Sequence, residues 1–266
     1  MRSFAASLPG IRANFSRRGA ALVLIALFAL PGLAGDKPAH TQLVDSGTFG
    51  IFVSGQRIGT EKFRIERTAD ESSLTSSEVT VEDSNGRASQ SSELQVSGKG
   101  DLMRYSWQEQ TPGRAQSVVE PSDAVLLQRI TLNATDKPIN QKYLLPTSTL
   151  ILDDYFFVHR EILAWRFLAG VCTPSPEGLR CKTGRGEFPV LVPRQQTSAS
   201  VAIEFSGTEE LMFKGAKHKL SRFVLRTASG DPSAGGLPDS VDWTIWLDSE
   251  NKLVRVVAAG MEVVRD

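Results

Sequence analysis

The chain has 266 residues, of which 41% are hydrophobic and 23% charged; these values are typical of globular proteins and exclude wholesale disorder. Its formal charge is +0, and the first 34 residues carry Arg2, Arg12, Arg17 and Arg18 but no acidic residue. Without them, 30 − 4 = 26 basic residues stand against 30 acidic ones, a net charge of −4. This balance argues against nucleic-acid binding and against adsorption to an anionic membrane, since both require clustered basic side chains.

The N-terminal 34 residues have the three features of a signal peptide in the usual order. A basic segment ending in Arg17-Arg18 precedes an apolar run over residues 20–30, and small residues follow at Gly32 and Ala34. The apolar run is shorter than the roughly 20 residues that a membrane-spanning helix needs. We therefore expect a cleaved signal peptide, a periplasmic protein and no transmembrane segment after cleavage. An uncleaved N-terminal anchor is the alternative.

Residues 35–46 are predicted to form a flexible lead-in, and residues 47–266 a single β domain. Apolar and polar side chains alternate in short runs, as at Phe49, Ile51 and Val53, and turn residues separate the runs. This period of two is typical of antiparallel strands that are covered on one side. About a dozen strands in consecutive hairpins predict a mainly β fold with a large curved antiparallel sheet, an open or half barrel.

Residues 150–168 depart from this pattern, because their apolar spacing is that of an α-helix. Apolar side chains recur at intervals of three and four, at Ile151, Tyr155, Val158, Ile162 and Trp165. Asp153 and Asp154 would lie near the positive N-terminal end of the helix, and Gly170 would end it. Since the helix is apolar on most sides, we expect it to be the main helix and to pack on the concave face of the sheet.

The two cysteines, Cys172 and Cys181, are close in sequence and flank a segment rich in proline and glycine. In an oxidising compartment, thiols that a hairpin brings together form a disulfide. A zinc site would need three or four ligands, and no histidine is near. The spacing also differs from the C-x-x-C of redox enzymes. The sequence therefore predicts a structural disulfide.

Catalysis by a nucleophile requires a base and an orienting group as well. His159, beside Asp153 and Glu161, is the histidine in the most promising environment, since His40 lies in the lead-in and His218 between two lysines. A histidine on the polar edge of a helix is nevertheless more often structural. No cluster of His, Asp and Glu has metal-ligand spacing, and no phosphate-binding glycine motif occurs. We therefore predict no catalytic residue, no metal and no cofactor.

Aromatic side chains supply the strongest indication of binding. On one interpretation they fill the space between sheet and helix; on the other they line a concave cavity that holds an apolar ligand. On the second interpretation the candidate ligand-binding residues are Trp107, Tyr155, Phe156, Trp165, Trp243 and Trp246. Trp243 and Trp246 should lie on opposite faces of one strand, one of them on the less buried face, because strand side chains alternate.

Three segments resemble a family of uncharacterised exported bacterial proteins. They are Gly47–Glu61, Leu152–Phe157, and the terminal Trp246-Leu247-Asp248 with Leu253–Val256. The fold of that family resembles the half barrel of the periplasmic lipoprotein carriers (LolA/LolB-like), a curved antiparallel sheet with helices over its concave side. The resemblance implies an envelope protein and transfers no site residue. The segment between Cys172 and Cys181 lies outside the shared pattern.

Three functional hypotheses follow. The first is a periplasmic, non-enzymatic protein that binds an apolar or amphipathic ligand: a lipid, a lipoprotein acyl chain or a glycolipid. The second is a structural or interaction module of an envelope assembly, with another envelope protein as partner, using an exposed sheet edge or aromatic patch. The third is a hydrolase built around His159.

Overall fold

The computed structural model describes residues 41–83, 86–133, 135–153, 155–175, 178–181, 184–228 and 242–266. They belong to a compact unit of residues 38–266. The predicted signal peptide, its cleavage site and the first half of the predicted lead-in, residues 35–40, lie outside the described residues.

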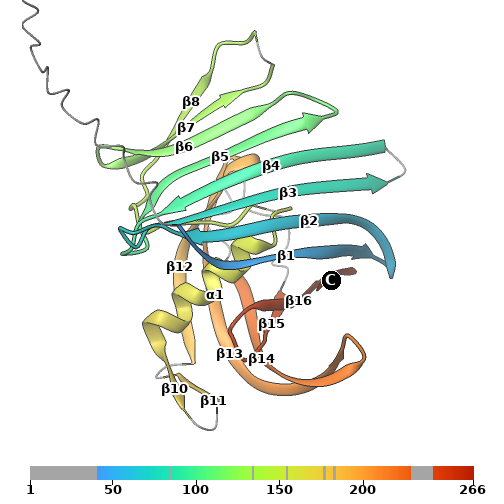
Figure 1. Cartoon of the computed structure of the whole chain (residues 1–266). Helices are drawn as coiled ribbons and strands as arrows, with labels where there is room; N and C mark the ends of the chain where they lie inside the picture. The colour runs from blue at the N-terminus through green and yellow to red at the C-terminus, as the bar shows by residue number, and fades with distance from the viewer. Residues whose placement is uncertain are drawn as a thin grey trace, which may run out of the picture. The chain divides into compact units, whose positions relative to one another are not determined.

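One sheet of fifteen strands contains nearly all of the ordered β structure, in the order β8-β7-β6-β5-β4-β3-β2-β1-β17-β16-β15-β14-β13-β12-β9 (Figure 1). Its first half is built from consecutive hairpins: β1 (Gln42–Val53), β2 (Gln56–Arg67), β3 (Ser73–Asp83), β4 (Gly86–Val96), β5 (Leu102–Thr111), β6 (Gln116–Ser122), β7 (Val125–Thr131) and β8 (Ile139–Tyr143). Its second half comprises β9 (Leu150–Ile151), β12 (Arg185–Val192), β13 (Thr197–Phe213), β14 (Ala216–Ala228), β15 (Trp243–Leu247), β16 (Leu253–Ala258) and β17 (Met261–Arg265).

The two halves join where the last strand returns to the first. β1 pairs antiparallel with β17, with Phe49 opposite Arg265 and Val53 opposite Met261. β1 starts at Gln42, so residues 42–46, which we expected in the lead-in, are part of the sheet. The physical reason is the buried Asp45, which Arg265 holds on the inner face.

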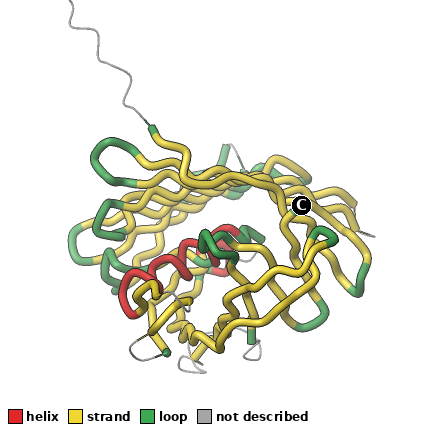
Figure 2. Tube along the Cα trace, turned by 60° about the horizontal axis from the view of Figure 1, so that its bottom comes forward, coloured by secondary structure: helices red, strands yellow, loops and turns green. Residues whose placement is uncertain are grey.

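The sheet curves strongly but is not closed, as predicted for an open barrel. Figure 2 shows the strands curving around the helix. The strands β8 and β9 at its two ends do not pair with each other in the described part of the chain. Side chains approach across the opening instead: Tyr143 of β8 and Leu126 of β7 pack in one cluster with Ile151 of β9 and Leu191 of β12. The predicted mainly β fold is therefore confirmed.

The main helix, α1 (Val158–Val171), lies in the concavity of the sheet, as expected, but starts later than the sequence indicated. Leu150 and Ile151 form β9, paired in parallel with Val190 and Leu191 of β12. Backbone pairing with an edge strand thus outweighs the helical spacing of these residues. Asp153 consequently lies before the helix rather than in its first turn, and Gly170 lies inside it.

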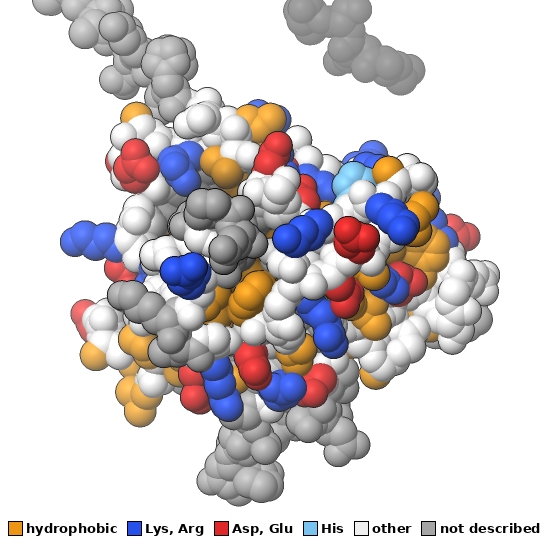
Figure 3. All heavy atoms as spheres, turned by 90° about the horizontal axis from the view of Figure 1, so that it is seen from below, with side chains coloured by type: hydrophobic (Ala, Val, Ile, Leu, Met, Phe, Trp, Pro, Cys, Tyr) orange, Lys and Arg blue, Asp and Glu red, His pale blue; other side chains and the backbone are white. Residues whose placement is uncertain are grey.

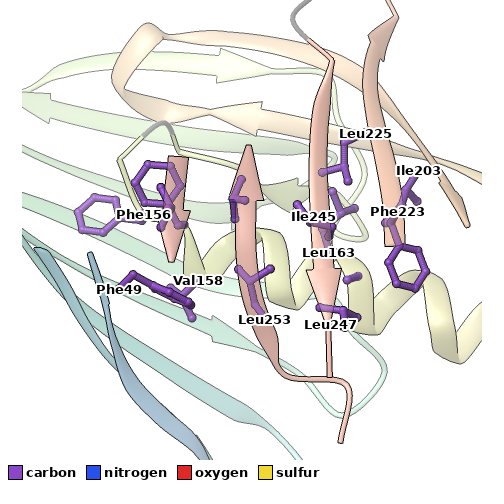
Figure 4. Packing of buried hydrophobic residues seen from close by; sticks show 14 of the residues in the cluster. Phe49, Phe156, Val158, Leu163, Ile203, Phe223, Leu225, Ile245, Leu247 and Leu253 are labelled. Atoms are coloured by element: carbon purple, nitrogen blue, oxygen red, sulfur yellow. The ribbon is translucent and has the colours of Figure 1, made fainter. Parts of the chain in front are cut away.

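The apolar core fills the space between α1 and the sheet. Figure 4 shows Val158 and Leu163 of α1 among Ile245, Leu247 and Leu253 of the neighbouring strands. A gap lined by α1, β4 and β9 measures about 10 Å³, which is the space of one water molecule. α1 therefore acts as a core element of the half barrel.

The cysteines form the predicted disulfide. Cys172 and Cys181 are directly opposite each other at the base of a two-stranded hairpin, β10 (Cys172–Ser175) and β11 (Gly178–Cys181), with an S–S distance of 2.03 Å. The hairpin directly follows α1. A short 3₁₀ helix, η1 (Pro193–Gln195), connects β12 to β13. Among the described residues, none of the helices has the length and hydrophobicity needed to cross a membrane.

Candidate functional site

The six aromatic residues predicted to bind a ligand do not line one common cavity; they lie in several separate parts of the structure. Phe156 is fully buried in the core. Trp107 is half-buried, and its indole Nε1 donates a hydrogen bond to Gln90 Oε1 at 2.8 Å. The Arg194 guanidinium lies over the rings of Trp107 and Tyr155, 5.1 Å and 4.9 Å from their centroids. Trp107 and Tyr155 thus come together around one cation.

Trp243 takes part in a second arginine–aromatic stack at the N-terminal end of α1. The Arg160 guanidinium lies 4.1 Å from the Trp243 ring centroid and 5.0 Å from that of Phe157. Arg160 is buried, so the stack belongs to the packing of the helix against β15.

The two remaining tryptophans lie elsewhere. Trp165 donates its Nε1 hydrogen to the backbone oxygen of Asn251 at 2.6 Å, which fixes α1 to the turn before β16. Trp246 lies on the face of β15 opposite to Trp243, as alternation predicts. That outer face is not the less buried one here, because Trp246 belongs to a small cluster with Leu220 and Val254 and is almost fully covered.

His159 sits in a buried polar cluster with Asp153 and Tyr105. Asp153 N donates to His159 Nδ1 at 3.3 Å, and Tyr105 Oη donates to Asp153 Oδ2 at 2.7 Å. Burial, with the nearby Arg160 charge, lowers the His159 pKa to about 3, so the imidazole is neutral. His159 is only 1% exposed. These contacts join β5, the segment before α1 and the helix itself.

Glu61 of β2 holds the N-terminal end of α1. Its carboxylate accepts hydrogen bonds from Phe157 N at 2.8 Å, Val158 N at 3.3 Å and Ser77 Oγ at 2.7 Å. The first backbone N–H groups of a helix have no partner inside the helix, so a carboxylate from another element can satisfy them. Burial is the main reason why the Glu61 pKa is raised to about 7. Local sequence gave no signal for this cap, because its donor and acceptor are far apart in the chain.

A second cluster of ionisable side chains lies beside α1 and consists of Asp45, Arg265 and Glu161. Arg265 Nη2 donates to both carboxylate oxygens of Asp45, at 2.7 Å and 2.9 Å, and Arg265 Nη1 donates to the backbone oxygen of Leu253. Glu161 lies beside Asp45; burial first, and the Asp45 charge second, hold the Glu161 pKa well above its usual range. Burial therefore favours the neutral form of the Glu161 carboxyl group beside Asp45.

An outer cleft of about 400 Å³ lies between the β13–β14 hairpin and strands β16 and β17. Figure 3 shows that, on the face seen from below, hydrophobic side chains reach the surface between acidic and basic ones. The apolar residues that line the outer cleft include Leu211, Phe213, Leu220, Val254 and Val264. The charged residues that line it are Lys214, Arg255, Glu262, Arg265 and Asp266.

A larger depression of about 590 Å³ lies on the outer face of β2 to β6 and is polar in character. Small hydroxyl side chains, Ser76, Ser91 and Ser106, occupy neighbouring strands there, with charged residues such as Lys62 and Glu93 around them. Its polar lining suits an apolar ligand less well than the outer cleft does. In the described part of the chain, no group of three or more His, Cys, Asp and Glu side chains could hold a metal ion.

Sequence reasoning missed the outer cleft, because it predicts two short strands, over residues 200–205 and 211–213, where the structure has the single strand β13. The structure has a bulge between Phe205 and Gly207 rather than an end of the strand. The signal that could have revealed a long hairpin was the alternation of apolar side chains on both sides of the turn at Lys214-Gly215.

The architecture defines the class: an open, barrel-like antiparallel β protein with a helix in its concave face. A solved structure of this class, a "Beta-barrel-like Protein of Domain of Unknown Function DUF1849 from Brucella abortus", is similar to this chain with a TM-score of 0.51 and 9% sequence identity. The similarity covers 83% of this chain and 95% of that chain. At this identity it concerns the fold alone. No known protein family and no curated protein matches the sequence.

Proposed function

We propose that the protein is a non-enzymatic binding protein of the bacterial cell envelope. Its ligand is an amphiphile with an acyl chain, such as a fatty acid or the chain of a lipid or lipoprotein, and it binds in the outer cleft. The observation that carries the proposal is an apolar cleft of about 400 Å³ outside a filled core. Binding sites for small molecules have volumes of roughly this size and apolar walls with a few polar groups.

The interior is a weaker candidate for the ligand site. α1 and its side chains occupy the concave face, and the gap beside His159 measures about 10 Å³. Phe156, one of the expected ligand contacts, is fully buried in the core. The proposal therefore keeps the class of ligand that the sequence suggested and assigns it to the outer face.

The charges at the rim favour a ligand with an anionic head. Arg255 Nε donates to Glu262 Oε1 at 2.7 Å, and its guanidinium lies 5.0 Å from the Trp246 ring centroid. Arg255 is partly exposed, so a carboxylate can reach it from solvent. Each methylene that leaves water for the apolar walls contributes about 0.8 kcal/mol, and a charge-assisted hydrogen bond orients the head.

The test is binding of a dansyl-labelled fatty acid, followed by its fluorescence, to the wild-type protein and to Val264→Asp. Val264 is a partly exposed wall residue of the outer cleft, so a carboxylate there should repel the acyl chain and weaken binding by about tenfold or more, or about 1.4 kcal/mol. The matched control is Val118→Asp, at a partly exposed valine on the outer face of β6. Equal binding of the probe by both variants and the wild type would exclude the outer cleft as the ligand site.

A second candidate function is an interaction module of an envelope assembly, which an edge strand favours. In the described part of the chain β8 pairs with β7 alone, and exposed apolar side chains surround it: Leu132, Ile139 and Leu144. Leu144 is 90% exposed. An edge with unpaired backbone groups can accept a strand from another protein. Affinity capture from the envelope fraction with wild type and Ile139→Lys tests this function; equal capture by both would argue against the edge.

A further inference from the structure

The outer end of the β13–β14 hairpin, residues Gly207–Leu220, forms an arm that extends beyond the rest of the sheet. β13 and β14 pair along their whole length, from Ser200 opposite Ala228 to Phe213 opposite Ala216. β15, by contrast, pairs with β14 only from Ser221 to Leu225. Figure 1 shows this arm as a curved ribbon that projects past β15. The arm is therefore a two-stranded ribbon without a neighbour in the sheet.

A bulge marks the base of the arm. The register of β13 against β14 shifts between Phe205 and Gly207, and Gly207 has a backbone φ of 110°. A bulge bends its strand and increases the local twist, and glycine adopts this φ without a steric penalty. The bulge thus bends β13 at the base of the arm.

The tip of the arm is attached to the body by few contacts. Lys214 Nζ donates to the main-chain oxygen of Asp266 at 2.5 Å, and Trp246 Nε1 donates to the Glu209 carboxylate. Leu211 and Phe213 pack on the small cluster around Trp246, separately from the main core. Isolated two-stranded ribbons are marginal in water, so these few contacts determine whether the arm is closed.

The arm also forms one wall of the outer cleft. Leu211, Phe213 and Lys214 come from the arm, whereas Val254 and Val264 come from β16 and β17 on the body. Any movement about the bulge at Gly207 therefore changes the width of the cleft directly. An acyl chain between the two walls would contact both and hold the arm closed.

We propose that the arm is a lid over the outer cleft, hinged at the Gly207 bulge and latched by Lys214 to Asp266. The proposal rests on the proposed function for its ligand, while the hinge and latch stand on the geometry of the hairpin. Opening releases the latch and separates the apolar walls; an acyl chain enters, and closure buries it between Leu211 and Val264.

Hydrogen exchange measured by mass spectrometry on the full chain tests the lid. In the wild type, amides of residues 208–219 should exchange faster than those of the β1–β2 hairpin, whose strands also pair with β17 and β3, and the dansyl-labelled fatty acid should slow them. Lys214→Met removes the ammonium donor and keeps the apolar stem. It should accelerate exchange in the arm by about tenfold, as for a locally opening segment, and raise the association and dissociation rates of the probe together. Lys142→Met, at an exposed lysine of β8, is the matched control.

The possible outcomes distinguish failure of the lid proposal from failure of the proposed acyl ligand. Arm amides that exchange as slowly as β1–β2 in both the wild type and Lys214→Met would overturn the lid. Probe binding that leaves exchange in the arm unchanged would overturn it too. Faster exchange confined to the arm of Lys214→Met, without any binding of the probe, would support the hinged arm and reject the acyl ligand. A general loss of protection in Lys214→Met would show that the contact is structural, and would overturn its role as a latch.

Discussion

Buried ionisable side chains determine how α1 is held in the sheet. Glu61 accepts the N–H groups at the start of the helix, and Asp45 binds Arg265 through both oxygens. Glu161 of α1 lies beside Asp45, and burial raises the pKa of its carboxyl group. A charge inside a protein needs a dipole or an opposite charge close by, because removal from water is costly. These partners therefore fix the position of the helix as well as satisfying the charges.

The pKa of Glu61 predicts how stability depends on pH. That pKa is about 7 in the folded protein, chiefly because of burial, against an ordinary value of 4.5. Between these values the folded state keeps a proton that the unfolded chain has lost. The contribution to the free energy of unfolding is complete below the unfolded pKa, and it is lost as pH rises through the folded pKa. Glu61→Gln keeps an acceptor for the helix and removes this titration.

We expect Glu61→Gln to flatten the decline of stability between about pH 4.5 and about pH 7 by up to about 1.4 kcal/mol per pH unit. Urea unfolding at several pH values measures the slope. Glu66→Gln, on the same strand, is the control, because an ion pair with Arg64 lowers the Glu66 pKa and it contributes nothing of this sign. An unchanged slope in Glu61→Gln would contradict the assignment.

Among the secondary-structure elements, α1, the arm of the β13–β14 hairpin and the β10–β11 hairpin are held in place by different contacts. Main-core side chains surround α1. The arm depends on a small separate cluster, and the β10–β11 hairpin on the bond between Cys172 and Cys181. Short two-stranded hairpins are marginal without such support. Local stability should therefore be lower in the arm and in the β10–β11 hairpin than in α1, and local opening should occur mainly in these two hairpins.

The disulfide should stabilise the protein by a modest amount. It closes a short loop, with a sequence separation of 9. The chain-entropy estimate for a loop of this size is about 2–3 kcal/mol. The double variant Cys172→Ser/Cys181→Ser should lose about that much free energy of unfolding, measured by urea titration. Wild-type protein unfolded in the presence of a reductant should show the same loss, whereas no difference between oxidised and reduced protein would contradict the prediction.

At the scale of the whole molecule, the half barrel is open in its hydrogen bonding but bridged by side chains. Gln128 of β7 is fully buried; its Nε2 donates to Ser117 Oγ and to the backbone oxygen of Pro193 in η1, each at 2.8 Å. Tyr143 Oη donates to Gln128 Oε1 at 2.7 Å. One side chain thus connects the β6–β8 end of the sheet to the segment after β12 and limits how far the two ends can separate.

Gln128→Leu should destabilise the protein by about 3 kcal/mol, because buried groups on Ser117, Tyr143 and Pro193 lose a partner and each such loss costs about 1–3 kcal/mol. Thermal and chemical unfolding would measure the change. Gln116→Leu, at an exposed glutamine of β6, serves as control and should change stability by less than about 0.5 kcal/mol. Equal stability of the two variants would show that the bridge contributes little.

Much of the fold could be predicted because it depends on local patterns. Alternation in strands and turn residues between them indicated an open antiparallel sheet, and the position of Trp243 and Trp246 on opposite faces followed from it. The start of α1 could not be predicted, since Leu150 and Ile151 have helical spacing and become a strand only because β12 offers a parallel edge. The place of the proposed ligand site could not be predicted, because the outer cleft brings the β13–β14 hairpin together with β16 and β17.

The sequence by itself determined the β architecture, the presence of a main apolar helix and the disulfide between Cys172 and Cys181. Each of these depends on periodicity or on residues near each other in the chain. The tertiary structure was needed to show where α1 begins, that Glu61 caps it, and that the β13–β14 hairpin lines an outer cleft together with β16 and β17. These features join segments distant in sequence, and the free energy of burying them together is set by packing rather than by local preference.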